Sequence, residues 1–285
     1  MNVIVPDYYK DFECIADRCR HSCCKGWEID IDDVTLSHYE SIKGDFGKRL
    51  KENISFEDTP HFRLTEDERC PFLDECGLCD IIKTLGKDAL CQICDDHPRF
   101  KNYYPDRTEI GLGLCCEAAA ELILGKKEKT YLVGSIESDT FTAFRDRIFS
   151  ILQDRSIPLD KRADKMLSLC GGEFPHKTAD EWRDIYLSLE RLDDEWENCL
   201  NKISDFSFSD GNDVPYEQLL VYFIYRHLTP DCDLSKYAVF AVLSYRIIRA
   251  IAGGDFEKLV ETARMYSSEI EYSDENADIL IKKYC

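Results

Sequence analysis

The second half of the chain repeats apolar positions with the period of amphipathic helices. From Trp182 to Ile203 the apolar residues recur at steps of three and four, which predicts one long helix with a buried face. Ser273 or Asp274 is a candidate N-cap for the last helix of the chain. The same reasoning predicts further helices over residues 140–153, 160–169, 215–228, 234–252, 255–269 and 274–284.

The first half is less regular. Residues 56–80 contain prolines and a glycine and predict loops with at most short strands. Gly86 is a possible interruption of the helix that follows, and His97-Pro98 ends it, because a residue before proline disfavours the helical conformation. The helices predicted in this half span residues 36–54, 81–95 and 115–124, the last ending at Gly125.

These patterns predict a mainly α protein in two parts. A lysine-rich stretch between Gly125 and Gly134 separates them. We expect a cysteine-rich metal-binding region with short irregular elements at residues 1–130, packed on a helical array at residues 131–285.

Composition indicates a protein with its own core and reduced thiols. The chain has 285 residues, of which 44% are hydrophobic, so disulfides are not needed to compensate for a small core. The N-terminus shows no signal-peptide pattern, and no run of 18 or more apolar residues is present. We therefore expect a cytoplasmic protein with no membrane span.

The formal charge of −20 bears on possible partners. Nucleic acid is not an expected partner, because phosphate binding needs a basic surface. A basic protein substrate would be attracted, although solubility alone also explains the charge. Basic side chains gather near the first cysteines, where cations lower thiol pKa values, at Arg18, Arg20, His21 and Lys25.

The cysteines are strongly clustered. Eleven of the fifteen fall within the first 116 residues, in four groups. Such clustering in a reducing compartment is typical of thiolates that bind a metal ion or an iron–sulfur cluster. The isolated Cys170, Cys199, Cys232 and Cys285 are expected to be small core residues.

Two C-x2-C pairs approach the spacing of a zinc ribbon. Cys76 pairs with Cys79, and eleven residues later Cys91 pairs with Cys94. Zinc and iron–sulfur sites both take thiolates, about four for each site, so spacing does not separate them. The first group lacks the third cysteine of a radical-type C-x3-C-x2-C loop, since Gly26 stands there. His97 is a possible ligand or a hydrogen-bonding residue beside the site.

Several motifs in order carry a family resemblance. They are Phe12-Glu-Cys14, Cys19-x3-Cys23-Cys24-x-Gly26-Trp27, Cys70-Pro-Phe-Leu73, Gly77-Leu-Cys79, Cys94-x2-His97-Pro98-Arg99 and Leu114-Cys115-Cys116. The chain resembles the flagellin lysine N-methylase family, and its front half is similar to an eight-cysteine zinc- or iron-chelating domain. The cysteines that match this domain, and that the resemblance makes metal ligands, are Cys14, Cys19, Cys23, Cys24, Cys70, Cys79, Cys94 and Cys116.

The resemblance implies methyl transfer from S-adenosylmethionine to lysine amines of flagellin or a similar protein. It also implies a [4Fe–4S] cluster, with zinc as the alternative. It assigns no catalytic residue and no methyl-donor site. Three of the clustered cysteines, Cys76, Cys91 and Cys115, lie outside the shared eight, and Glu117 stands where family members often have proline. The alternatives are a non-catalytic zinc- or iron-binding protein, or a structural zinc domain with a helical interaction module.

Overall fold

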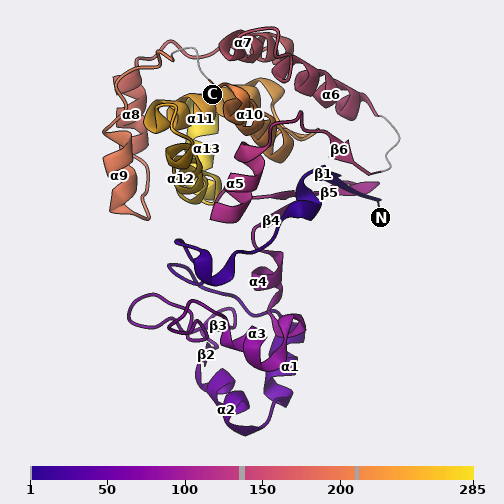
Figure 1. The fold of residues 1–285 in the computed structure, drawn as a ribbon, viewed down its shortest axis with the longest axis vertical. Coiled ribbons are helices and arrows are strands. Elements are labelled where there is room, and N and C mark those ends of the chain that lie inside the picture. The colour runs from indigo at the N-terminus through magenta and orange to yellow at the C-terminus, as the bar shows by residue number, and fades with distance from the viewer. Residues whose placement is uncertain (1, 135–138, 209–211) are drawn as a thin grey trace. The chain divides into compact units, whose positions relative to one another are not determined.

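The computed structural model of the protein describes residues 2–134, 139–208 and 212–285. The chain forms two compact units (Figure 1). We call Met1–Phe12 together with Phe100–Cys285 the helical unit, and Glu13–Arg99 the cysteine unit. The predicted mainly α class is confirmed.

The helical unit is built around two long buried helices. Eleven of the fourteen residues of α10 (Val214–His227) are buried, and α11 (Leu234–Ala252) packs against α7, α10, α12 and α13. Figure 1 shows α10 to α13 side by side. The other helices of this unit are α5 (Glu117–Gly125), α6 (Thr140–Leu152), α7 (Leu159–Cys170), α8 (Ala179–Leu187), α9 (Asp194–Leu200), α12 (Phe256–Tyr266) and α13 (Asp274–Lys283).

A small sheet adds to the helical unit and was not predicted. Its strand order is β4-β5-β1-β6, formed by β4 (Arg99–Tyr103), β5 (Arg107–Leu112), β1 (Asn2–Pro6) and β6 (Leu132–Val133). β1 runs parallel to β5 and antiparallel to β6. Gly111 on β5 leaves room for the ring of Phe100, which a Cβ at this position would overlap.

This sheet explains why the compact units differ from the division expected at residue 130. β4 and β5 pair within the sheet that contains β1, and α5 packs against α10 and α12. Residues 100–134 therefore belong with the helices. The sequence pattern of these residues is local, whereas their place in the fold depends on pairing with the N-terminal strand.

The cysteine unit has short elements and a small core. Its elements are α1 (Asp33–Ser41), α2 (Gly44–Glu52), β2 (Ile54–Ser55), β3 (His61–Phe62), α3 (Asp80–Leu85) and α4 (Gln92–Asp96). β2 and β3 form a two-stranded antiparallel pair, so the prediction of short strands and loops is confirmed. The core centres on Tyr39, Leu50, Phe62 and Phe72, all buried.

Most predicted helices are present. Two of them, each predicted as continuous, are divided by a break into two helices. Residues 36–54 form α1 and α2, separated near Gly44, which has a φ of 81°. Residues 182–203 form α8 and α9 instead of one helix. Between them the carboxylate of Glu269 accepts hydrogen bonds from the backbone of Leu192 at 2.9 Å and Asp193 at 3.0 Å. This distant side chain satisfies donors that a continuous helix would have used itself.

The sequence also predicted where several helices begin, end or are interrupted. Gly86 does interrupt the predicted helix at 81–95, leaving α3, a short 3-10 turn and α4. Ser273 caps α13 by accepting a hydrogen bond from the Asn276 backbone. α12 ends at Tyr266 and continues as a π-helical turn over Ser267–Glu271, so the helix predicted at 255–269 is shorter and changes type.

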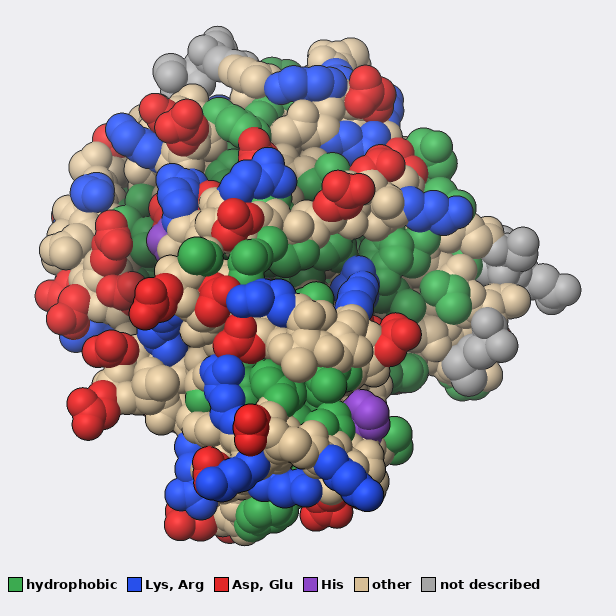
Figure 2. Space-filling model, turned by 60° about the horizontal axis from the view of Figure 1, so that its bottom comes forward, with side chains coloured by type: hydrophobic (Ala, Val, Ile, Leu, Met, Phe, Trp, Pro, Cys, Tyr) green, Lys and Arg blue, Asp and Glu red, His purple; other side chains and the backbone are tan. Residues whose placement is uncertain are grey.

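The surface is acidic with both signs of charge interspersed. Figure 2 shows acidic side chains over much of the face that it draws, with lysines and arginines between them. Within the described ranges, none of the helices has both the length and the apolar character that crossing a membrane requires.

Candidate functional site

Five cysteines meet in the core of the cysteine unit. Cys70 and Cys91 are buried members of this core, and Cys24, Cys79 and Cys94 pack against it partly buried. The sulfur atoms of Cys91 and Cys94 are 3.3 Å apart. The backbone amide of Cys70 donates to the carbonyl of Cys24 at 2.8 Å, which joins the first cysteine group to the second. We call these five residues the cysteine core.

Arg49 on α2 fixes two of the cysteine-bearing loops. Its guanidinium bonds the carboxylate of Asp80 at 2.9 Å and the carbonyl of Pro71 at 2.6 Å. Asp80 follows Cys79 and Pro71 follows Cys70 in sequence. One arginine therefore holds the backbone beside both cysteines.

The segment with Cys91 and Cys94 is fixed from α1. Asp32 caps α1 and also accepts a hydrogen bond from the backbone of Gln92 at 2.9 Å. The hydroxyl of Tyr39 donates to the carbonyl of Ala89 at 2.7 Å in the buried core. A helix places positions i and i+3 on one face, and Cys91 precedes α4 directly, so both thiols face this core.

The other predicted ligands lie elsewhere. Cys14, Cys19 and Cys23 lie on the loop that opens the cysteine unit, where Cys14 and Cys23 are exposed. The thiol of Cys19 donates to the carbonyl of His21 at 3.3 Å. Cys116 belongs to the helical unit, where it precedes α5. Of the eight predicted ligands, Cys24, Cys70, Cys79 and Cys94 thus share one core, and Cys23 of the opening loop hydrogen-bonds Cys24.

The pKa values of the thiols in the cysteine core are shifted in different directions. Burial raises the pKa of Cys70 to about 12. A hydrogen bond with Cys23 lowers the pKa of Cys24 to about 7. The hydrogen bond with Cys91, followed by burial, raises the pKa of Cys94. Burial and then the charge of Arg99 lower the pKa of His97 to about 4, which leaves a neutral imidazole. Several negative thiolates in so small a volume would repel one another unless a cation joined them.

The donor set fits a thiolate-bound metal group in kind and number. Five thiols in one core exceed the four that a closed zinc site or a [4Fe–4S] cluster takes. Across the described residues, however, no three Cys, His, Asp or Glu side chains already form a group that could hold a metal ion. Binding therefore requires these side chains to converge further, with Cys24, Cys70, Cys79, Cys91 and Cys94 as the available donors.

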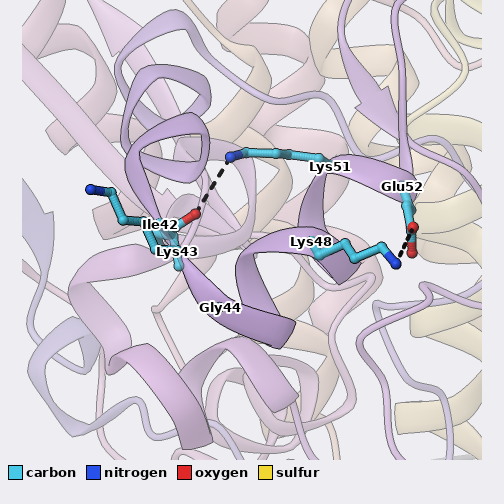
Figure 3. A pocket seen from close by; sticks show the side chains of 6 residues that line it. All are labelled: Ile42, Lys43, Gly44, Lys48, Lys51 and Glu52. Atoms are coloured by element: carbon cyan, nitrogen blue, oxygen red, sulfur yellow. Dashed lines mark hydrogen bonds and ion pairs between the residues drawn. The ribbon is translucent and has the colours of Figure 1, made fainter.

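Two surface hollows formed by described residues contain no cysteine side chains. One of about 520 Å³ lies at the start of α2 and is lined by Lys43, Lys48 and Lys51, with Ile42, Gly44 and Glu52 (Figure 3). Lys48 and Glu52 are 3.6 Å apart and largely exposed, at 76% and 62%. A second hollow of about 550 Å³ in the helical unit is lined partly by Thr130, Arg145 and Gln153.

Sequence reasoning missed two features. The family resemblance left out Cys91, which the C-x2-C spacing had included and which is fully buried in the cysteine core. His227 had no evident partner in sequence, but its Nε2 lies 2.6 Å from the carboxylate of Glu271 in the helical unit.

Comparison with known proteins finds a matching family model and several similar proteins. The model of the FliB lysine N-methylase C-terminal domain matches residues 173–284, which include α8 to α13. A "Lysine-N-methylase" from Salmonella typhimurium and another from Salmonella choleraesuis are 33% identical over 133 residues, which are 44% of this chain and 33% of each relative. The chain thus spans about a third of the length of these two relatives. No solved structure matches significantly.

A shorter relative is matched over most of its length. The "Flagellar biosynthetic protein FliU" of Salmonella muenchen is 30% identical over 131 residues, which cover 44% of this chain and 78% of that protein. The sequence motifs and these relatives relate the chain to proteins that are named as lysine N-methylases or as flagellar biosynthetic proteins. The chain belongs to the flagellin lysine N-methylase family.

Proposed function

We propose that this protein is an S-adenosylmethionine-dependent protein-lysine N-methyltransferase whose acceptor is flagellin or a similar lysine-bearing protein. The observation that carries the proposal is the match of residues 173–284 to a lysine N-methylase C-terminal domain. Two relatives with lysine-N-methylase in their names, and one named as a flagellar biosynthetic protein, support it. The acidic surface favours a basic acceptor segment.

The reaction sets two requirements for the residues of this chain. A lysine amine with a pKa of about 10.4 must lose a proton before its lone pair can attack. The attack then forms the N–CH3 bond while the S–CH3 bond breaks, and the electron pair stays on sulfur as a neutral thioether. The protein must therefore accept a proton and align amine, methyl carbon and sulfur within about 3–3.5 Å contact.

We also propose that the cysteine core binds a thiolate-held group, a [4Fe–4S] cluster or alternatively zinc. Support comes from the five thiols that meet in one core and from Arg49, Asp32 and Tyr39, which fix the loops that carry them. A bound group would keep the thiols deprotonated and tie these loops together. Reduced thiols and a cytoplasmic location are part of this proposal.

Single-cysteine variants of the full chain test that part. Cys79→Ser should lose most bound metal, whereas Cys170→Ser, a half-buried cysteine of the helical unit, should keep it. Cys23→Ser tests whether the opening loop also supplies a ligand. Equal metal content in Cys79→Ser and Cys170→Ser would contradict the assignment of the core.

Methyl transfer itself needs a direct assay. Purified full chain, radiolabelled S-adenosylmethionine and flagellin should give label on lysine, and a flagellin with its surface lysines changed to arginine should take up far less. Label that depends on this protein and on acceptor lysines supports the proposal. An absence of label with metal-loaded protein and several lysine-bearing acceptors would contradict it.

One observation favours a second function. The cysteine core lies entirely within one compact unit, outside residues 173–284 that match the lysine N-methylase domain. A non-catalytic iron- or zinc-binding protein would use the same thiols. It would bind metal in stoichiometric amount and transfer no methyl group, so the two assays together separate the functions.

A further inference from the structure

A buried carboxylate in the helical unit has an unusual set of partners. The side chain of Glu271 has no exposed surface and contacts Arg226 Nε at 3.3 Å and His227 Nε2 at 2.6 Å. The hydroxyl of Tyr222 lies 3.1 Å from both oxygens of this carboxylate. The same hydroxyl accepts from Arg226 at 2.7 Å and from the Leu114 backbone at 3.3 Å.

Two local structures bring these groups together. Tyr222 and Arg226 are one helical turn apart on α10, and His227 is its last residue. Glu271 ends the π-helical turn Ser267–Glu271, which directly follows α12. Single π-helical turns are rare and occur frequently at functional sites. This turn directs the carboxylate at the C-terminal end of α10.

Two other buried carboxylates of the helical unit are held by arginines. Glu109 is held by Arg107 at 2.9 Å and by two contacts with Arg145 at 2.6 and 2.8 Å. Glu217 is held by Arg155 at 2.9 Å and Arg162 at 2.6 Å. Arginines stay charged at any physiological pH, so these two clusters cannot exchange protons. The Glu271 cluster instead contains a histidine, which titrates in the neutral range.

We propose that His227 and Glu271 form a proton-accepting dyad, in which His227 takes the proton from the substrate amine and Glu271 orients its ring. This inference rests on the proposed function and names a catalytic residue for it. Nε2–H donates to Glu271, so Nδ1 carries the lone pair that accepts a proton from the lysine ammonium. The freed amine lone pair forms the N–CH3 bond, and the bond to sulfur breaks with its electrons kept by sulfur.

The surroundings of His227 agree with this role. Its side chain keeps 17% of its surface exposed. The ring stacks on Phe223 at 6.0 Å and meets Phe240 of α11 edge-on at 5.5 Å, so both its faces are constrained. Burial lowers the pKa of His227, the charge of Glu271 opposes this, and Arg226 adds to it, which leaves the ring neutral at neutral pH.

Two aromatic rings position Arg226 beside the carboxylate of Glu271. The guanidinium of Arg226 lies 5.1 Å from the ring centre of Phe100 and 4.7 Å from that of Tyr272. Tyr272 is 49% exposed and directly follows Glu271. These rings already hold the Arg226 guanidinium by cation–π contact, and this contact fixes the arginine that pairs with Glu271.

The pH profile of methyl transfer tests the dyad. In His227→Gln we expect the initial rate at pH 7.5 to fall about 10²- to 10⁴-fold. The rate should recover as pH approaches the pKa of lysine itself, about 10.4, because the amine then deprotonates in solution. Glu271→Gln should shift the profile in the same direction. His176→Gln is the matched control, since His176 lies in the same unit and its side chain is 94% exposed.

A wild-type profile retained by folded His227→Gln would overturn the dyad and leave the methyltransferase intact. A second measurement needs neither variants nor activity. Diethyl pyrocarbonate acylates accessible, unprotonated imidazole nitrogen, and mass spectrometry locates the product. We expect His227 and His176 both to react in the native full chain at pH 7. If wild-type protein transfers no methyl group, the proposed function fails and the dyad fails with it. If wild-type protein does transfer methyl groups, an unreactive His227 ring overturns the dyad alone.

Discussion

The helical unit and the cysteine unit are stabilised by different means. The helical unit buries long apolar faces, and its buried carboxylates Glu109, Glu217 and Glu271 are each matched by cationic or hydrogen-bonding partners. The cysteine unit has short elements and a much smaller core, into which five thiols are built. Small cores of this kind usually need a disulfide or a metal. If the thiols bind the proposed metal group, the comparison predicts that the cysteine unit depends on this group for its stability much more than the helical unit does.

Removal of the bound group should give the largest effect and should affect one unit. Structural metals contribute on the order of 10 kcal/mol to the folding of small zinc domains. Full-length protein treated with a chelator should therefore become sensitive to protease within residues 13–99, while 100–285 resists. Cleavage spread evenly over both units would show that their stabilities are not separate.

A change to a buried ion cluster should give the reverse pattern. In Glu217→Gln the guanidiniums of Arg155 and Arg162 lose their charged partner, and breaking a buried pair costs about 3–5 kcal/mol. Thermal unfolding should shift for the helical unit, with metal content unchanged. Glu173→Gln, at an exposed position with 86% side-chain exposure, is the control and should shift little.

Acid should weaken the helical unit through Glu271. Burial opposes its ionisation, but Arg226 and His227 hold the pKa at about 2, below the value of about 4.3 in an unfolded chain. A lowered carboxyl pKa gives stability that is present above pH 4.3 and is lost as pH falls toward 2, about 3 kcal/mol in all. Denaturant unfolding of Glu271→Gln should differ from wild type at pH 6, and this difference should shrink by pH 2.5. A constant difference would count against the charged carboxylate.

A helix cap should give the smallest effect. Thr178 and Glu181 form a capping box at the start of α8, with Thr178 Oγ1 accepting from the Glu181 backbone at 3.2 Å. Thr178→Ala should cost about 1 kcal/mol in the helical unit, measured by denaturant unfolding. Thr178→Ser keeps the hydroxyl and should cost less. No change in the protease sensitivity of residues 13–99 is expected for either variant.

The sequence predicted what depends on local periodicity. α6, α7, α10, α11 and α13 lie within a residue or two of their predicted ranges, because each has an apolar face at helical spacing. The break between α8 and α9 was missed, since it depends on Glu269, which is 77 residues from Leu192. The sheet was missed for the same reason: β1 pairs with a strand more than 100 residues later.

For the candidate site too, the sequence predicted local features and missed contacts between distant residues. Four of the eight cysteines predicted as ligands share one core, and their binding of a metal group stays a prediction. The resemblance did not include Cys91, which lies in the cysteine core, and it included Cys116, which lies in the helical unit, because membership of a core depends on tertiary packing. The contact of His227 with Glu271 spans 44 residues and the end of a π-helical turn, which has no recognised sequence signal.

Metal and acid-labile sulfide content of the anaerobically purified full chain tests the central claim most directly. The account predicts about four iron and four sulfide per chain for a [4Fe–4S] cluster, or stoichiometric zinc without sulfide. It also predicts loss of either group in Cys79→Ser and retention in Cys170→Ser. Metal-free protein whose residues 13–99 remain folded and protease-resistant would contradict it.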